Sequence, residues 1–116
     1  MGAAATFLSI VTAIVMLALC AFDFSGPPRV LDLVRRLGHR PGFHRTLGLV
    51  KGLGGLGLLV GLVVGPIGVL AAIGLVVYFI LAIRAHSRLG DSGAETLPAA
   101  AMFILCALTL IALIFS

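Results

Sequence analysis

Lys51 is the residue whose type and surroundings point most directly to chemistry. It is the only lysine in the chain, and it lies within the apolar, glycine-rich run at 47–66. Such a run is typical of a membrane span, where an ionisable side chain is costly and therefore marks a structural or functional polar site. The ammonium can extend toward the membrane surface, pair with an acid, or serve a ligand or proton site.

Four further polar side chains are expected near the same depth. Asp23 ends the first apolar run, and Lys51 and Tyr78 lie at equal intervals from the arginine that flanks their own runs. At about 1.5 Å per helical residue, both then lie roughly 9 Å from one membrane surface. We therefore predict an ion pair between Asp23 and Lys51, direct or through water. The predicted polar site comprises Lys51, Asp23, Tyr78, Arg84 and His86.

This constellation has two interpretations, and the residues leave both open. The ion pair could hold the first two spans together, or it could form part of a ligand or proton site. His86 could titrate near neutral pH or simply be solvated, and Tyr78 could be an interfacial aromatic or a hydroxyl donor. No metal site is predicted, because His39 and His44 lack ligand spacing with His86. The sequence also has no nucleotide loop, nucleophile triad or haem motif, so catalysis by this chain alone is not indicated.

Composition places these residues in a membrane. The chain has 116 residues, of which 61% are hydrophobic and 10% charged, whereas soluble domains are about 25% charged. Runs of about 20 apolar residues are long enough to span a bilayer. We predict one all-α domain over 1–116, a bundle of four transmembrane helices. The expected spans lie at about 3–22, 46–64, 66–85 and 97–115.

A short helix is expected between the first two spans, at about 27–37. Two prolines open it, as suits a helix start, and its apolar residues fall on one face opposite its charges. Such a helix lies in the head-group layer. It could anchor the chain at the interface or bind an anionic lipid or partner.

The arginines predict the orientation and argue against nucleic acid as a partner. They gather between apolar runs, and positive loops stay on the cytoplasmic side. We expect a multi-pass protein of the cell (inner) membrane with both termini outside. The arginines between the first two spans are Arg29, Arg35, Arg36, Arg40 and Arg45, and Arg84 and Arg88 follow the third.

Glycines at intervals of four predict close helix packing in the second span. Small residues at this spacing let helix backbones approach where lipid provides no hydrophobic drive. They could serve packing within one bundle, self-association into a homo-oligomer, or room for a flat ligand. The predicted packing glycines are Gly48, Gly52, Gly57, Gly61 and Gly65, and Gly65-Pro66 is expected to form a tight turn before the third span.

Three stretches resemble the DoxX-like family of small four-helix membrane proteins, especially its actinobacterial members. They are Ala21-Phe22-Asp23-Phe24, the glycine-rich run 47–62, and 68–79 leading into Ala82-Ile83-Arg84-Ala85-His86. The resemblance covers about 22–98. Many relatives look as if they carry lysine after the first span and glutamate in the second. The signs at Asp23 and Lys51 are reversed together, as a pairing of the two positions predicts.

The resemblance implies a membrane subunit associated with oxidoreductases. The family's namesakes are subunits of a thiosulfate:quinone oxidoreductase, and mycobacterial relatives are linked to membrane redox and thiol-stress complexes. A bound quinone or other isoprenoid, hydrogen-bonded by Lys51 and Tyr78, would be the expected ligand, and membrane lipids and a protein of the complex the expected partners. Two alternatives stay open: a small enzyme acting on a lipophilic substrate, and a small transporter.

Overall fold

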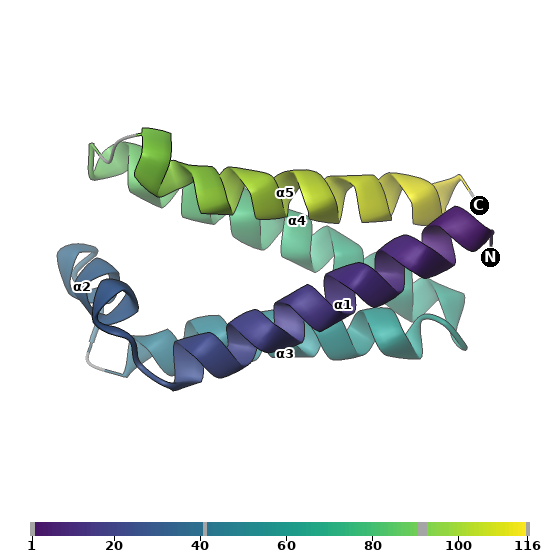
Figure 1. The fold of residues 1–116 in the computed structure, drawn as a ribbon, viewed down its shortest axis with the longest axis horizontal. Helices are drawn as coiled ribbons and strands as arrows, with labels where there is room; N and C mark the ends of the chain where they lie inside the picture. The colour runs from purple at the N-terminus through teal and green to yellow at the C-terminus, as the bar shows by residue number, and fades with distance from the viewer. Residues whose placement is uncertain (1, 41, 91–92, 116) are drawn as a thin grey trace.

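The computed structural model describes residues 2–40, 42–90 and 93–115, and throughout these residues the chain is helical and has no strand. The predicted all-α class is confirmed. The helices described are α1 (Ala3–Phe24), α2 (Pro28–Arg36), α3 (Phe43–Val60), α4 (Gly65–Arg88) and α5 (Gly93–Ile114) (Figure 1).

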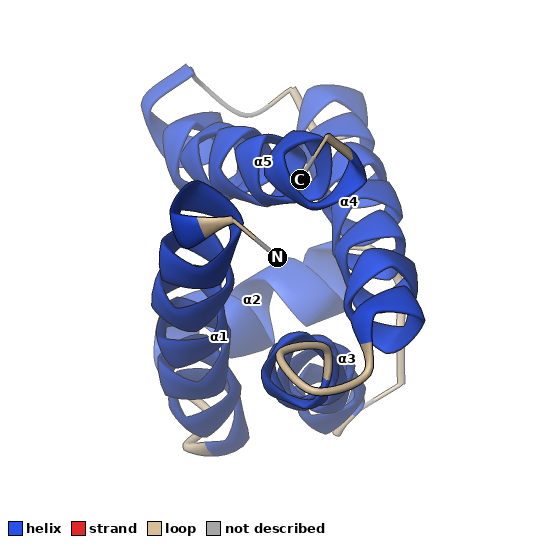
Figure 2. Cartoon of the chain, turned by 90° about the vertical axis from the view of Figure 1, so that its right-hand side faces the viewer, coloured by secondary structure: helices blue, strands red, loops and turns tan. Residues whose placement is uncertain are grey.

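The four long helices pack in a ring. The most extensive contacts join α1 to α3 and α4 to α5, and the contacts α3–α4 and α1–α5 close the ring. Figure 2 looks along this ring and shows α2 lying across its far end. Both chain termini and the turn from α3 to α4 lie at one end (Figure 1). The opposite end therefore gathers α2, the end of α4 and the start of α5.

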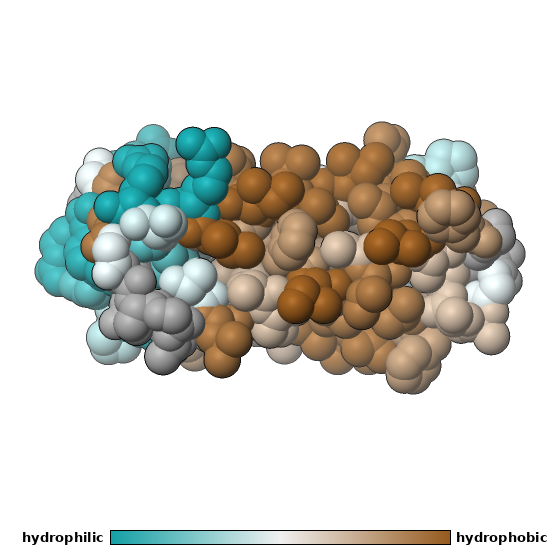
Figure 3. Space-filling view, turned by 90° about the horizontal axis from the view of Figure 1, so that it is seen from above, coloured by the Kyte–Doolittle hydropathy of each residue, from teal (hydrophilic) through white to brown (hydrophobic). Residues whose placement is uncertain are grey.

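The outer surface of the ring is apolar. Large hydrophobic side chains of all four long helices point outward, among them Phe7, Leu53, Leu70 and Ile104. Figure 3 shows a hydrophobic surface over most of the length and hydrophilic residues gathered at the α2 end. Exposed apolar area on this scale is unfavourable in water and is the surface that contacts lipid tails.

Among the described residues, three helical segments are long and apolar enough to cross a membrane: Ala3–Phe24, Gly65–Arg88 and Thr96–Ile114. The helix α3 is not among them. Its first turns carry His44 and Arg45, Lys51 follows, and glycines take the place of larger apolar residues. The expected second span thus forms a helix of lower hydropathy than its neighbours.

Several helix boundaries differ from the prediction, and two of these differences change the connections between the long helices. The turn between α3 and α4 lies at 61–64, so the expected Gly65-Pro66 turn is wrong. Pro66 belongs to the first turn of α4, where its fixed φ is favourable and its missing N–H costs nothing. α5 begins at Gly93, earlier than the expected 97, and it continues through Pro98.

Glycines on one face of α3 bring it against α1. A Cβ added at Gly48 would lie 3.1 Å from the Asp23 Cβ, and one at Gly52 would lie 2.8 Å from the Cys20 Sγ. Gly55 continues this face, since its Cβ would meet a carbonyl oxygen of α1 at 3.1 Å. Larger side chains at these positions would push the two helices apart, as the four-residue spacing predicts for Gly48 and Gly52.

A second set of glycines on α3 faces α4. At Gly61 an added Cβ would lie 2.4 Å from the Cα of Gly68, so the two backbones are nearly in contact. Gly54 and Gly57 are equally restricted by side chains of α4. Gly65 does not share this role, because an added Cβ there meets nothing within 4 Å. The predicted set of packing glycines therefore missed Gly54 and Gly55, and its inclusion of Gly65 was wrong.

A hydrogen bond between threonines joins α1 to α5. The hydroxyls of Thr12 and Thr109 lie 2.7 Å apart, and both side chains are fully buried. The Thr109 hydroxyl donates to the Leu105 carbonyl at 2.9 Å, so Thr12 is the donor between the two. The pair satisfies both hydroxyls in the buried contact between α1 and α5.

Candidate functional site

Asp23 and Lys51 meet where α1 ends against α3. The glycine face of α3 lets Asp23, in the last turn of α1, approach the first half of α3. The Lys51 Nζ donates to the Asp23 Oδ2 at 2.7 Å. The Lys51 side chain is 12% exposed and that of Asp23 is 4% exposed. The predicted ion pair is present, it is direct, and it is largely shielded from solvent.

Tyr78 adds a third polar group from α4. The Lys51 Nζ lies 5.5 Å from the centre of the Tyr78 ring, within the range of a cation–π attraction. Phe79 contacts the Tyr78 ring edge-on, with ring centres 5.0 Å apart. Charge pairing from α1 and the ring face from α4 therefore both stabilise the ammonium of α3.

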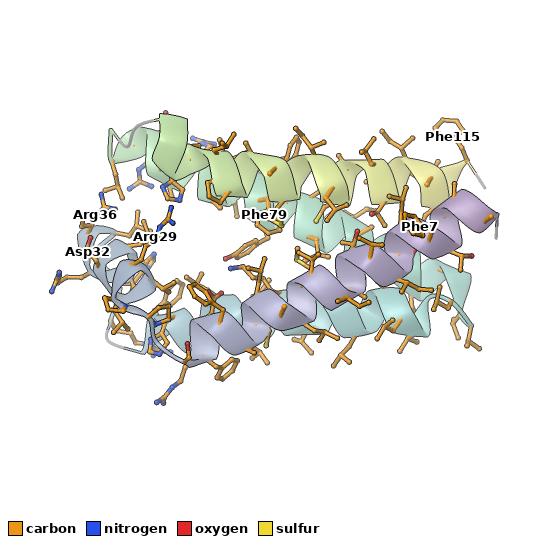
Figure 4. All side chains as sticks on the ribbon, viewed as in Figure 1. Phe7, Arg29, Asp32, Arg36, Phe79 and Phe115 are labelled. Atoms are coloured by element: carbon orange, nitrogen blue, oxygen red, sulfur yellow. The ribbon has the colours of Figure 1, made fainter. Side chains whose placement is uncertain are left out.

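These groups line a cavity of about 400 Å³ at the α2 end of the ring. We define its floor as Asp23, Lys51, Tyr78 and Phe79. Figure 4 shows Phe79 pointing from α4 toward the interior. Apolar side chains complete the walls: Leu19, Phe22, Leu47, Ala82 and Met102. A mostly apolar cavity with a few converging polar groups is the usual form of a small-molecule site.

Charges of α2 form the mouth of this cavity, which we define as Arg29, Asp32 and Arg36. All three lie on α2 at the end of the molecule (Figure 4). The Asp32 carboxylate accepts from Arg35 at 2.7 Å and from Arg36 at 3.1 Å. The hydrogen bond from Arg35, aided by the charge of Arg36, holds the pKa of Asp32 below its usual value.

The cavity contains four of the five predicted polar residues. Asp23, Lys51, Tyr78 and His86 line it. Arg84 is exposed and does not contribute to its lining. The reason is helical geometry: Arg84 lies two residues from His86 and therefore on another face of α4. Among the described residues, no cluster of three or more His, Cys, Asp or Glu side chains is arranged to hold a metal ion.

The sequence prediction missed the contribution of α2. The sequence predicted an interfacial helix that anchors the chain or binds an anionic lipid or partner. The structure adds that Arg29, Asp32 and Arg36 line the cavity together with Val30 and Leu33. The amphipathic pattern shows that α2 has two faces, but it does not show that α2 folds back over the ring. Phe79 was also missed, because an aromatic residue in an apolar span carries no distinguishing signal.

The comparisons with known proteins identify a family and no individual match. No match is found among curated proteins, and none among solved structures. A family model described as the DoxX-like family matches residues 7–110. The match and the apolar helices together indicate a multi-pass integral membrane protein. Because the match spans most of the sequence, from α1 into α5, the chain belongs to the DoxX-like family.

Proposed function

We propose that this chain is a membrane subunit that binds a neutral, lipid-soluble carbonyl compound of the quinone type in the 400 Å³ cavity. The observation that carries the proposal is the arrangement at the floor. Asp23 and Lys51 compensate each other's charge at 2.7 Å, so the floor favours a ligand without net charge. A charged ligand would leave one ion unbalanced in a poorly solvated place, which is costly.

The floor also offers hydrogen bonds to such a ligand. An ammonium has three N–H donors, and Asp23 takes one of Lys51's. The remaining N–H groups of Lys51 and the Tyr78 hydroxyl can donate hydrogen bonds to a carbonyl oxygen on a flat ligand ring. The apolar walls would cover the ring, because Leu19, Leu47 and Met102 line the cavity together with the floor.

The proposed setting is a redox-associated complex in the cell (inner) membrane. Quinones exchange electrons with other cofactors, and the resemblance to oxidoreductase subunits supports a partner that carries them. We propose that this chain supplies a quinone site and that a partner protein supplies the electron path. Native mass spectrometry of gently solubilised protein tests this. A homogeneous monomer or homodimer with neither partner nor isoprenoid bound would contradict it.

We also propose that α3 is the fourth span and that the α2 end faces the cytoplasm. α3 lies between α1 and α4 in the ring and exposes Leu49, Leu53 and Leu56 outward. The arginines gathered at the α2 end support the orientation. Cysteines placed at Val63 and at His39, after replacement of Cys20 and Cys106, should differ in labelling by an impermeant maleimide. Intact cells should label only Val63→Cys.

Ligand binding is tested with menadione, a naphthoquinone without a tail, on purified protein in nanodiscs. Tyr78→Phe keeps the ring and removes one donor, so the Kd should rise about fivefold, or ~1 kcal/mol. Arg84→Met is the matched control, because it removes an exposed cation outside the cavity and should leave the Kd unchanged. Wild-type protein that does not bind menadione, or equal effects of both substitutions, would refute the proposal.

A further inference from the structure

A second cavity, of about 320 Å³, lies beside the first. It is bounded by α2, α3 and α4, and its lining is mainly apolar, including Leu37, Phe43, Val50 and Leu81. Val50 is 38% exposed and Leu81 is 58% exposed, so this cavity reaches the outer surface of the ring. In a membrane, that surface faces lipid tails.

The two cavities share part of their lining. Leu33, Leu47, Tyr78, Ala82 and His86 line both of them. The two cavities therefore adjoin along one layer of side chains from α2, α3 and α4. Tyr78 belongs to this layer and to the floor of the first cavity, where it contacts Lys51.

The mouth and the second cavity differ in what they can accommodate. Arg29, Asp32 and Arg36 at the mouth are charged, and Asp32 forms ion pairs with two arginines. A hydrocarbon chain placed among them would desolvate these charges without compensating contacts. The second cavity instead offers apolar side chains, which favour such a chain by the hydrophobic effect.

We propose that the second cavity holds the hydrocarbon tail of the ligand whose head lies on the floor of the first. This rests on the proposed function and deepens it: the ligand is a neutral carbonyl compound with a long apolar tail. The head reaches Lys51 sideways from the bilayer, between α3 and α4 and beneath α2. Leu47 and Ala82, in the shared layer, lie where the tail passes from one cavity to the other.

The test compares two ligands that differ only in the tail. Menadione has the ring alone, and menaquinone carries a polyisoprenoid chain on the same ring. Val50→Trp fills the second cavity without touching the first, since Val50 lines only the second. We expect its Kd for menaquinone in nanodiscs to rise about tenfold and its Kd for menadione to stay unchanged. Leu53→Trp is the matched control on the same helix, because Leu53 is 60% exposed and lines neither cavity.

Each alternative outcome would overturn either the tail assignment or the proposed function. Unchanged affinity of Val50→Trp for both ligands would overturn the tail assignment and leave the head site intact. An equal loss for both would also overturn it, because the substitution would then act on the head site or on the fold. Ala85→Phe, from the α4 wall of the second cavity, must repeat the menaquinone-specific loss even where Val50→Trp fails to fold. Wild-type protein that binds neither ligand would refute the proposed function itself.

Discussion

Removal of one member of the Asp23–Lys51 pair should destabilise the protein far more than removal of both. Two unit charges 2.7 Å apart attract each other by about 6 kcal/mol at an effective dielectric constant of ~20. Desolvation of each ion opposes this by several kcal/mol, so the net contribution of the intact pair is small. Lys51→Met leaves the Asp23 carboxylate alone in a site where it is 4% exposed. We expect a loss of about 3–5 kcal/mol in the free energy of unfolding.

The double variant Asp23→Asn with Lys51→Met separates pairing from general damage. It contains neither charge, so its cost should be under ~2 kcal/mol, that of a poorly satisfied amide. Unfolding is followed by far-UV circular dichroism during titration of SDS into micelles. Arg84→Met, which removes an exposed cation, should change the unfolding free energy by less than ~0.5 kcal/mol.

Two results would refute this reasoning. A cost of Lys51→Met below ~1 kcal/mol would show that the pair behaves like a solvated surface pair. A double variant as unstable as the two single variants summed would show that the charges act independently. The reversed pair, Asp23→Lys with Lys51→Asp, adds a further check: it should be more stable than either single reversal, since each of those places two like charges together.

Three further predictions concern packing and pH. Gly61→Ala should lower the free energy of unfolding, measured by SDS titration, by more than ~1 kcal/mol, because its Cβ would lie 2.4 Å from the Gly68 Cα. The control is Gly74→Ala, whose Cβ meets nothing within 4 Å. It should be neutral or should raise the free energy of unfolding by up to ~1 kcal/mol. Thr12→Val should cost about 0.6–1.7 kcal/mol in the same assay, and a loss no greater than that of an exposed substitution would contradict the buried bond. Arg35 and Arg36 lower the pKa of Asp32 in the folded protein. The ionised Asp32 carboxylate therefore contributes fully to stability when the pH is above its unfolded-state pKa of about 3.9. This contribution disappears as the pH falls through the lower pKa of the folded state. Asp32→Asn should remove that part of the acid-dependent decrease in melting temperature, and an unchanged pH profile would contradict the assignment.

The sequence predicted best the contacts of residues that carry a large free-energy cost when they are left uncompensated. A lone lysine in an apolar run requires compensation, and Asp23 was an acid at a matching depth, so their pairing was predictable. Glycines four apart predicted close packing of α3, and Gly48, Gly52, Gly57 and Gly61 confirm it.

The parts that failed depend on tertiary arrangement. Spacing alone could not show that α3 has two glycine faces, so Gly54 and Gly55 were missed. The Gly65-Pro66 turn was wrong because glycine and proline also suit the first turn of a helix. The position of Arg84 was wrong because depth along a helix does not specify the face on which a residue lies. The fold of α2 across the ring depends on a connection whose direction no periodicity encodes.

Because we propose α3 as the fourth span, its low hydropathy has a consequence for how the protein enters its membrane. A lysine within an inserting helix opposes insertion, by about 2.5–3.5 kcal/mol at the helix centre, and α3 also carries His44 and Arg45. Translation runs from the N-terminus, so α1 leaves the ribosome first and presents Asp23 before Lys51 emerges. The earlier helix can then act as an intramolecular chaperone, receiving α3 at the translocon through the acid and the close glycine contact. Chains in which α1 is deleted or moved to the C-terminus should therefore leave α3 uninserted, even though its own sequence is intact.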